Sequence, residues 1–449
     1  MDNSELKQLG SFVHRNCEGV SRRDAIKVGT LGFLGLTLPE FFALEAAQAQ
    51  ATPASAKPKT KADYSVIMLW MAGGPSHVDT WDPKPNADLK IRGPFGVAET
   101  NVPGIQIGEH LPKLARQMDK MAILRSVSHG DGAHERAEHF MQTGYLPLPT
   151  VEFPSYGSVI ANERGMQNNL PPYVSLLGMA NGQGAGFLGG SLNPFFAGNP
   201  GDGNYRVQDL QMPEGVSLAR MERRRRLVQA VDSLKTAQSD AIKSMDTFTN
   251  RAYGLITSKS AQQAFEIQKE KIALRDEYGR NGFGQSCLLA RRLVESGSRF
   301  VTITLGGWDT HENNFGSLQN GLLPMLDRGM ATLLRDLKER GLLDTTLVVW
   351  MGEFGRTPMI NMNANPGRDH WPNALSVVMA GGGIKGGQVI GKTDERGMGP
   401  AERPIKVQDI AASIYHTMGL DPNKEYHTPS GRPIRLADDG QVIRELFRG

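Results

Sequence analysis

The chain has 449 residues, of which 39% are hydrophobic and 22% charged, and its net charge is only +3 at pH 7. These values are typical of a globular protein with a large core, and they exclude a disordered chain and a strongly basic nucleic-acid-binding protein. Only two cysteines are present, Cys17 and Cys287. The first lies in a segment that we predict to be removed, which excludes an internal disulfide and a cysteine-based zinc cluster.

The first 49 residues have the features of a twin-arginine export signal. Arg22 and Arg23 precede a moderately apolar stretch, and Ala47-Gln48-Ala49 matches the small-x-small pattern that signal peptidases cleave. The apolar stretch, 28–38, is much shorter than the roughly 20 residues that a membrane-spanning helix needs. We therefore predict a signal peptide over 1–49, the twin-arginine translocase as a partner during export, and a periplasmic or secreted mature protein with no stable membrane span. An amphipathic or buried first helix is the alternative.

Residues 50–62 are a polar spacer rich in alanine, proline and lysine, which predicts a flexible linker before a folded domain over 63–449. In that domain, short apolar runs alternate with helical patterns. The predicted strands are 64–70, 122–127, 173–177, 300–305, 347–350 and 375–379. The predicted helices are 261–278, 284–296, 322–340 and 407–418.

Strands that alternate with helices predict an α/β fold, in which a mostly parallel central sheet carries helices on both faces as a three-layer sandwich. The region around 181–251 is less regular. It begins with a stretch rich in glycine, asparagine and proline and continues into a charged helical segment. We expect this region to be an insertion beside the sheet.

Histidines and carboxylates follow several predicted strands directly, and ligands of open parallel sheets bind beyond the carboxyl ends of the strands. Clustered imidazoles and carboxylates are stable when a cation holds them, and mixed nitrogen and oxygen ligands favour one or two divalent ions, Zn or Mn. Hydrogen-bonded structural histidines are the alternative. The six histidines in these loops are His77, His129, His134, His139, His311 and His370.

The segments GGPSHVDTWDPKP, HERAEHFMQTG, GGWDTHENN, GEFGRTP and GRDHW, in this order, resemble the exported domain-of-unknown-function family 1501. The likeness covers nearly the whole chain, and that family is similar in turn to the alkaline phosphatase and sulfatase superfamily. The resemblance implies an alkaline-phosphatase-like sandwich. It also implies the metal ligands His77, Asp79, Asp309, His311, Glu353 and His370.

Two positions depart from the pattern of the superfamily. His134 stands where sulfatases have a cysteine or serine nucleophile, and Cys287 lies too far along the chain to replace it. A formylglycine sulfatase is therefore not expected. Phe354 stands after Glu353, where the superfamily pattern has a histidine, so this chain lacks one ligand of a two-metal site.

The sequence therefore predicts an exported metal-dependent hydrolase of phosphate or sulfate esters, whose substrate is a small molecule or a polysaccharide. The nucleophile would be an activated water, His134 or Ser128. Arg136 or Arg356 would hold the anion, because the planar guanidinium fits a tetrahedral oxyanion. The alternative is a non-catalytic exported metal-binding protein that keeps the sulfatase-like fold.

Overall fold

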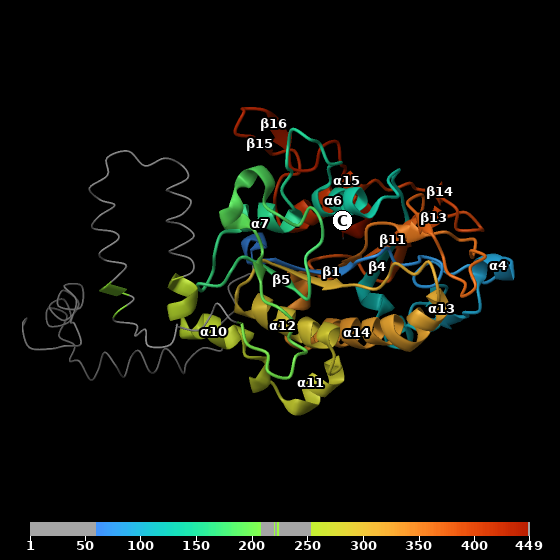
Figure 1. Cartoon of the computed structure of the whole chain (residues 1–449), viewed down its shortest axis with the longest axis horizontal. Helices are drawn as coiled ribbons and strands as arrows, with labels where there is room; N and C mark the ends of the chain where they lie inside the picture. Colours follow the sequence, from blue (N-terminus) through green and yellow to red (C-terminus); the bar gives the residue numbers. More distant parts are fainter. Residues whose placement is uncertain (1–59, 208–219, 221, 224–252, 448–449) are drawn as a thin grey trace, which may run out of the picture. The chain divides into compact units, whose positions relative to one another are not determined.

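The computed structural model of the chain describes residues 60–207, 220, 222, 223 and 253–447. Their core is one eight-stranded sheet in the order β12-β4-β11-β8-β1-β7-β5-β6 (Figure 1). Neighbouring strands are parallel except for the two pairs that involve β11. The strands are β1 (Ser65–Met71), β4 (Met121–Val127), β5 (Tyr173–Leu176), β6 (Phe195–Phe196), β7 (Phe300–Leu305), β8 (Thr346–Met351), β11 (Leu375–Ala380) and β12 (Gln388–Ile390).

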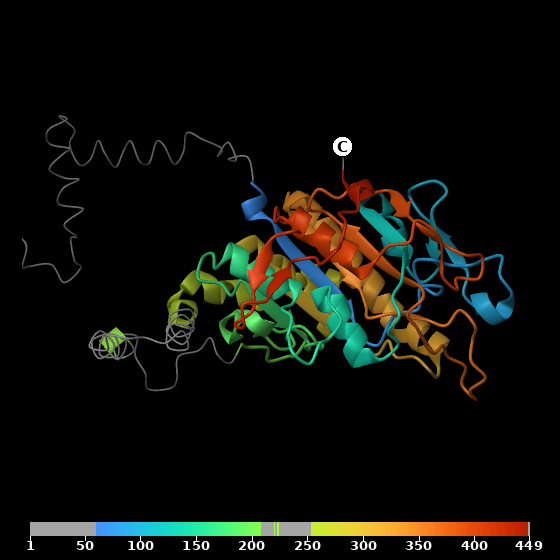
Figure 2. The ribbon, with the colours of Figure 1, turned by 90° about the horizontal axis from the view of Figure 1, so that it is seen from above.

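Helices cover both faces of this sheet. Side chains along β1 alternate between two separate hydrophobic cores, so that Val66 and Trp70 pack on one face and Ile67 and Met71 on the other. Figure 2 shows the sheet from the side on which α15 lies. On that side are α6 (His134–Thr143), α7 (Tyr156–Arg164) and α15 (Val407–Thr417), and on the other are α10 (Lys259–Phe265), α11 (Ile272–Tyr278), α12 (Gly282–Ser296) and α14 (Leu323–Glu339).

The predicted α/β class, with its mostly parallel central sheet and helices on both faces, is confirmed. All six predicted strands are present, and their ends lie within one residue of the predicted ends. The single helix predicted over 261–278 is wrong, because Glu266 leaves the helical conformation with a ψ of 74° and separates α10 from α11. Arg292 ends α10 there by donating hydrogen bonds to the carbonyls of Ala264 and Gln263, at 3.0 and 2.6 Å.

Shorter elements lie in the loops around the sheet. These are α4 (Leu89–Arg92), α5 (Pro112–Ala115), α13 (Asn314–Ser317), β2 (Val97–Glu99), β3 (Gln106–Gly108), β9 (Gly355–Arg356), β10 (His370–Trp371), β13 (Lys392–Thr393), β14 (Pro400–Glu402), β15 (Glu425–His427) and β16 (Pro433–Arg435).

Some of the predicted segments fall outside the described residues. These are the signal peptide over 1–49, most of the linker over 50–62, and most of the second half of the insertion around 181–251. The described first part of that insertion contributes β6, which pairs with β5 at one end of the sheet. Among the described residues, no helix is long and apolar enough to cross a bilayer.

The topology gathers several loops at one edge of the sheet. Strands β1, β4, β7 and β8 run in the same direction, so their carboxyl ends lie together. Strand β11 runs in the opposite direction, so the segment that leads into it, which includes β10, reaches the same edge. Residues that follow β1, β4, β7 and β8 and residues that precede β11 can therefore meet at this edge.

Gly73 lets the loop after β1 approach the loop after β7. Its φ is +113°, and a Cβ at this position would lie 2.3 Å from the backbone nitrogen of Asp309. A side chain of any size would push the two loops apart, so only glycine fits here. The position of Asp309 depends on this close approach.

Candidate metal centre

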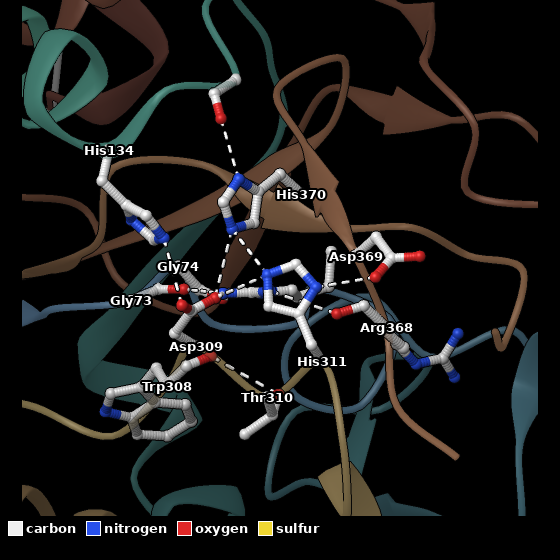
Figure 3. A network of polar contacts seen from close by, with 12 residues as sticks. Gly73, Gly74, His134, Trp308, Asp309, Thr310, His311, Arg368, Asp369 and His370 are labelled. Atoms are coloured by element: carbon white, nitrogen blue, oxygen red, sulfur yellow. Dashed lines mark hydrogen bonds and ion pairs between the residues drawn. The ribbon is translucent and has the colours of Figure 1, made fainter. Parts of the chain in front are cut away.

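Three side chains at this edge bring their ligand atoms together. The Nε2 atoms of His311 and His370 lie 2.9 Å apart, and they lie 3.0 and 3.1 Å from Oδ1 of Asp309. Figure 3 shows both rings turned toward the Asp309 carboxylate. Asp309 and His311 follow β7, and His370 begins β10, so the cluster joins the two kinds of connection that reach this edge.

Hydrogen bonds on the far side of each ring fix the tautomers. Nδ1 of His311 lies 2.7 Å from Oδ1 of Asp369, and Nδ1 of His370 lies 2.8 Å from the carbonyl oxygen of Gly132. A carboxylate and a carbonyl only accept, so both Nδ1 atoms carry the proton. A ring whose single proton lies on Nδ1 presents an unprotonated Nε2 to the other ring and to Asp309. Three acceptors about 3 Å apart repel one another unless a cation lies between them.

His134 approaches the same carboxylate from the start of α6. Its Nε2 lies 3.4 Å from Oδ2 of Asp309, and its Nδ1 donates a hydrogen bond to Oε1 of Glu353 at 2.7 Å. The fully buried Glu353 also accepts a hydrogen bond from the amide of Gly73 at 2.7 Å. His134, Asp309 and His370 have ligand atoms that lie within 4.8 Å of one another, so they also form a group that could hold an ion.

The charges at the cluster favour an ionised Asp309 and a neutral His370. Burial alone would raise the pKa of the Asp309 carboxyl, but the hydrogen bond and charge of Arg356 lower it to about 2. Burial lowers the pKa of His370 below its ordinary value, which keeps the ring neutral at pH 7. The hydrogen bond with Glu353 raises the pKa of His134.

The cluster is open on one side and closed on the other. The side chains of Asp309, His311 and His370 are 47%, 40% and 25% exposed, so an ion or a substrate can reach them. The buried ring of Phe354 packs against the other side, with its centroid 4.5 Å from that of His370 and 4.9 Å from that of His134.

Three predicted ligands, Asp79, His77 and Glu353, lie outside the cluster of Asp309, His311 and His370. Arg368 binds both carboxylate oxygens of Asp79, at 2.8 and 3.0 Å, and the two side chains are completely buried. Asn314 donates a third hydrogen bond to Asp79, at 3.0 Å. The ring of His77 is buried against the carbonyl oxygen of Gly397, at 2.9 Å, and burial lowers its pKa. A guanidinium therefore already neutralises Asp79.

The two predicted anion-binding arginines differ in their surroundings. Arg356 is buried and donates to the carbonyls of Gly73, Gly74 and Arg368 and, at 2.5 Å, to Oδ1 of Asp309. These contacts orient Asp309 and leave Arg356 pointing into the protein. The side chain of Arg136 is 54% exposed, and its Nε binds Asp131 at 2.7 Å. Arg136 lies in the first turn of α6, two residues after His134.

Sequence patterns did not reveal which partners Arg368 and Asp369 take. Asp369 precedes His370 in the sequence but bonds to His311, and Arg368 precedes Asp369 but bonds to Asp79. A signal was present in the charged segment GRDHW, which concentrates three ionisable side chains directly before a buried strand. Which partner each of them takes depends on the path of the loop between β9 and β10.

The fold and the cluster together define an α/β protein with a histidine and aspartate site at the carboxyl edge of its sheet. The chain matches the model of a family described as "Protein of unknown function (DUF1501)" over residues 63–447, and it belongs to this family. A comparison with curated protein sequences gives no significant match.

Solved structures to which the chain is similar include sulfatases and phosphatases. For the PsFucS1 sulfatase from Pseudoalteromonas sp., the identity is 14%, the TM-score is 0.39, and the match covers 92% of this chain and 80% of that one. For the alkaline phosphatase from the Antarctic bacterium TAB5, the identity is 12% and the TM-score is 0.34, and the match covers 79% of this chain and 98% of that one. For the phosphonate monoester hydrolase from Silicibacter pomeroyi, the identity is 13% and the TM-score is 0.35, and the match covers 85% of this chain and 76% of that one.

The buried pair of Asp79 and Arg368 gives a test of the structural role of Asp79. Replacing Asp79 with asparagine leaves the Arg368 guanidinium without a counter-charge, so we expect a loss of about 3–5 kcal/mol in the free energy of unfolding, measured in urea. As a control, Glu425→Gln removes one member of a half-exposed pair with Arg435 and should cost less than about 1 kcal/mol. An Asp79→Asn protein of unchanged stability would contradict the structural role.

Proposed function

We propose that Asp309, His311 and His370 bind one divalent metal ion. The observation that carries this proposal is the set of three facing acceptor atoms, whose imidazole tautomers are fixed by Asp369 and Gly132. Zinc bonds of 2.0–2.2 Å at tetrahedral angles place neighbouring ligand atoms about 3.3 Å apart. The separations of 2.9–3.1 Å are close to this value.

Two histidines and one carboxylate suit zinc, manganese or iron better than magnesium or calcium. We propose zinc, with manganese as the next candidate. A single ion is expected, because Asp79, the residue that resembles a further ligand, is already paired with Arg368. Arg368 thus provides the positive charge that a second ion would otherwise supply.

We propose that the centre hydrolyses phosphate or sulfate esters. When bound, the metal would act as a Lewis acid that polarises the ester and activates water. The chain itself supplies a base: Glu353 holds the Nδ1 proton of His134, which leaves Nε2 free to accept a proton from the attacking water. Attack by His134 itself is the other route that this position allows.

Arg136 is the better candidate for holding the anionic group of the substrate, because the donors of Arg356 are used inside the protein. The proposed substrate is an ester of a small molecule or a polysaccharide. The inward orientation of Arg356 also favours a second candidate function, that of a non-catalytic metal-binding protein. Activity measurements distinguish the two.

We also propose that the protein acts outside the cytoplasm. The arginine pair at 22–23, the apolar stretch and the cleavage pattern at 47–49 support export by the twin-arginine translocase to the periplasm or the medium. This route carries proteins that have already folded, so a metal could be loaded before export.

Metal analysis tests the ligand set. We expect about one zinc per purified mature chain, and a loss of that zinc in Asp309→Asn, His311→Ala and His370→Ala. Asp369→Asn should keep the ligands but weaken affinity by about 10- to 100-fold, because Asp369 only orients His311. His139→Ala is the matched control. His139 lies on α6, as His134 does, but its Nδ1 makes a hydrogen bond with the carbonyl of Tyr145. Full zinc content in the His370→Ala protein would exclude this site.

Kinetics on aryl phosphates and aryl sulfates test the role of His134. If Nε2 accepts the proton, His134→Ala should lower kcat by about 10²- to 10⁴-fold while the zinc content stays unchanged. Arg136→Met should instead raise KM. Loss of zinc in His134→Ala would make His134 a ligand rather than a base. A wild-type protein that holds zinc but turns over none of these esters would be the non-catalytic alternative.

Expression with and without the arginine pair tests export. In a bacterial host with the twin-arginine translocase, the wild-type chain should be found in the periplasm or medium with Gln50 as its first residue. The double substitution Arg22→Lys and Arg23→Lys should retain the full-length chain in the cytoplasm. Mass spectrometry of each fraction gives the N-terminus, and equal export of both proteins would exclude this route.

A further inference from the structure

A second cavity of about 390 Å³ lies outside the candidate metal centre. It opens where the loop after β1 meets β4 and the hairpin of β13 and β14. The volume falls within the range of small-molecule sites. Six charged residues line it: Asp82, Lys84, Arg125, Lys392, Glu402 and Arg403.

The inner wall of the cavity carries more positive than negative charge. The side chains of Lys84 and Arg125 are only 10% and 19% exposed, and both approach Oδ1 of Asp82, at 3.0 and 3.5 Å. The other oxygen of Asp82 accepts a hydrogen bond from Thr393. Two cations therefore share one carboxylate, which leaves one positive charge without a partner among the described residues that line the cavity.

Both cations also have hydrogen-bond donors to spare. The ammonium of Lys84 has three donors, and Asp82 is its contact within the described part of the chain. Arg125 donates through Nε to the carbonyl of Trp81 at 2.8 Å and through Nη2 to that of Gln106 at 2.7 Å. Its Nη1 has no such contact with any described residue. A ligand with several acceptor oxygens would satisfy these donors.

The outer rim is electrically balanced. Lys392 pairs with Glu402 at 3.7 Å, and Arg403 pairs with Glu445 through two nitrogens, at 2.7 and 3.2 Å. Each of these cations has its own carboxylate, and each side chain is more than 40% exposed. The surplus charge therefore belongs to Lys84 and Arg125.

The walls of the cavity are held in place by contacts between separate segments. Ser126, next to Arg125 on β4, donates a hydrogen bond of 2.5 Å to the carbonyl of Arg403. Gly391 has a φ of +74°, and a Cβ there would lie 1.8 Å from Oγ of Ser126. The hairpin is thus packed against β4, and these contacts hold two walls of the cavity together.

We propose that this cavity binds an oxyanion, namely the sulfate, phosphate or carboxylate group of an anionic ligand. A largely desolvated cation that shares its only counter-charge is costly, and an oxyanion would remove that cost. An arginine beside a lysine provides both the directed and the point-charge contacts that such groups accept. The proposal does not depend on the hydrolase function.

Calorimetric titration with inorganic sulfate, inorganic phosphate and acetate at low ionic strength tests this site. Saturable binding of at least one anion is expected. Lys84→Met and Arg125→Met should each weaken it about tenfold or more, because a hydrogen bond to a charged group is worth at least that factor. Lys120→Met is the matched control, because Lys120 also pairs with a nearby aspartate, Asp119, at 3.0 Å and does not line the cavity.

A second set of variants separates this cavity from the metal centre. Binding should persist in His370→Ala, which removes a proposed metal ligand, and Lys84→Arg should restore most of what Lys84→Met loses. Circular dichroism confirms that each variant is folded, and Arg125→Met carries the test if Lys84→Met is not. Anion binding that is lost in His370→Ala but kept in Lys84→Met overturns the proposal, as does a wild-type protein that binds none of the three anions.

The source of the anion follows from one further comparison. A sulfated disaccharide that binds the wild-type protein more tightly than sulfate, and loses that advantage in Lys84→Met, would indicate an anionic group carried by a larger molecule. Equal affinities would indicate a free ion. Both outcomes require a site at Lys84, and they differ only in what fills the rest of the cavity.

Discussion

The site depends on three acceptor atoms that the fold holds close together although they repel one another. Asp309, His311 and His370 present a carboxylate oxygen and two imidazole lone pairs to one another at about 3 Å. A hydrogen bond to a further group fixes each of these side chains. Arg356 donates to Asp309, whereas Asp369 and the carbonyl of Gly132 accept from His311 and His370. Such an arrangement is stable when a cation occupies its centre.

The rest of the fold makes this convergence geometrically possible. Parallel strands deliver Asp309 and His311 to the edge of the sheet, and the antiparallel strand β11 brings His370 to the same edge. Gly73 allows the loops after β1 and β7 to touch, and its amide also fixes Glu353, which in turn orients His134. The positions of these side chains therefore follow directly from the backbone topology.

A comparison of Asp79 with Asp309 shows how two similar positions acquire different roles. Both follow the end of a buried parallel strand, and both are paired with an arginine. Arg368 takes both oxygens of Asp79 in a fully buried pair, whereas Arg356 contacts only Oδ1 of a half-exposed Asp309, the oxygen that also faces His311 and His370, and Oδ2 faces His134. Asp79 is therefore suited to stabilising the fold, and Asp309 is suited to binding an ion.

Much of this could be predicted from the sequence, because strands buried on both faces give continuous apolar runs that mark their own ends. Those ends located the loops with Asp309, His311 and His370. The same reasoning placed His77 and Asp79 with them, since position after a strand does not reveal which partner a side chain meets. The contacts of Arg368 and Asp369 depend on the folded path of the loop from β9 to β10, which has no local periodic pattern.

Anomalous diffraction from crystals of the zinc-loaded mature protein, recorded on both sides of the zinc absorption edge, would locate the ion relative to Asp309, His311 and His370. We expect a single anomalous peak bonded to Oδ1 of Asp309 and to Nε2 of His311 and His370, with Asp79 still paired to Arg368. A peak at Asp79 and His77, or no peak among the three acceptors in a zinc-saturated crystal, would contradict it.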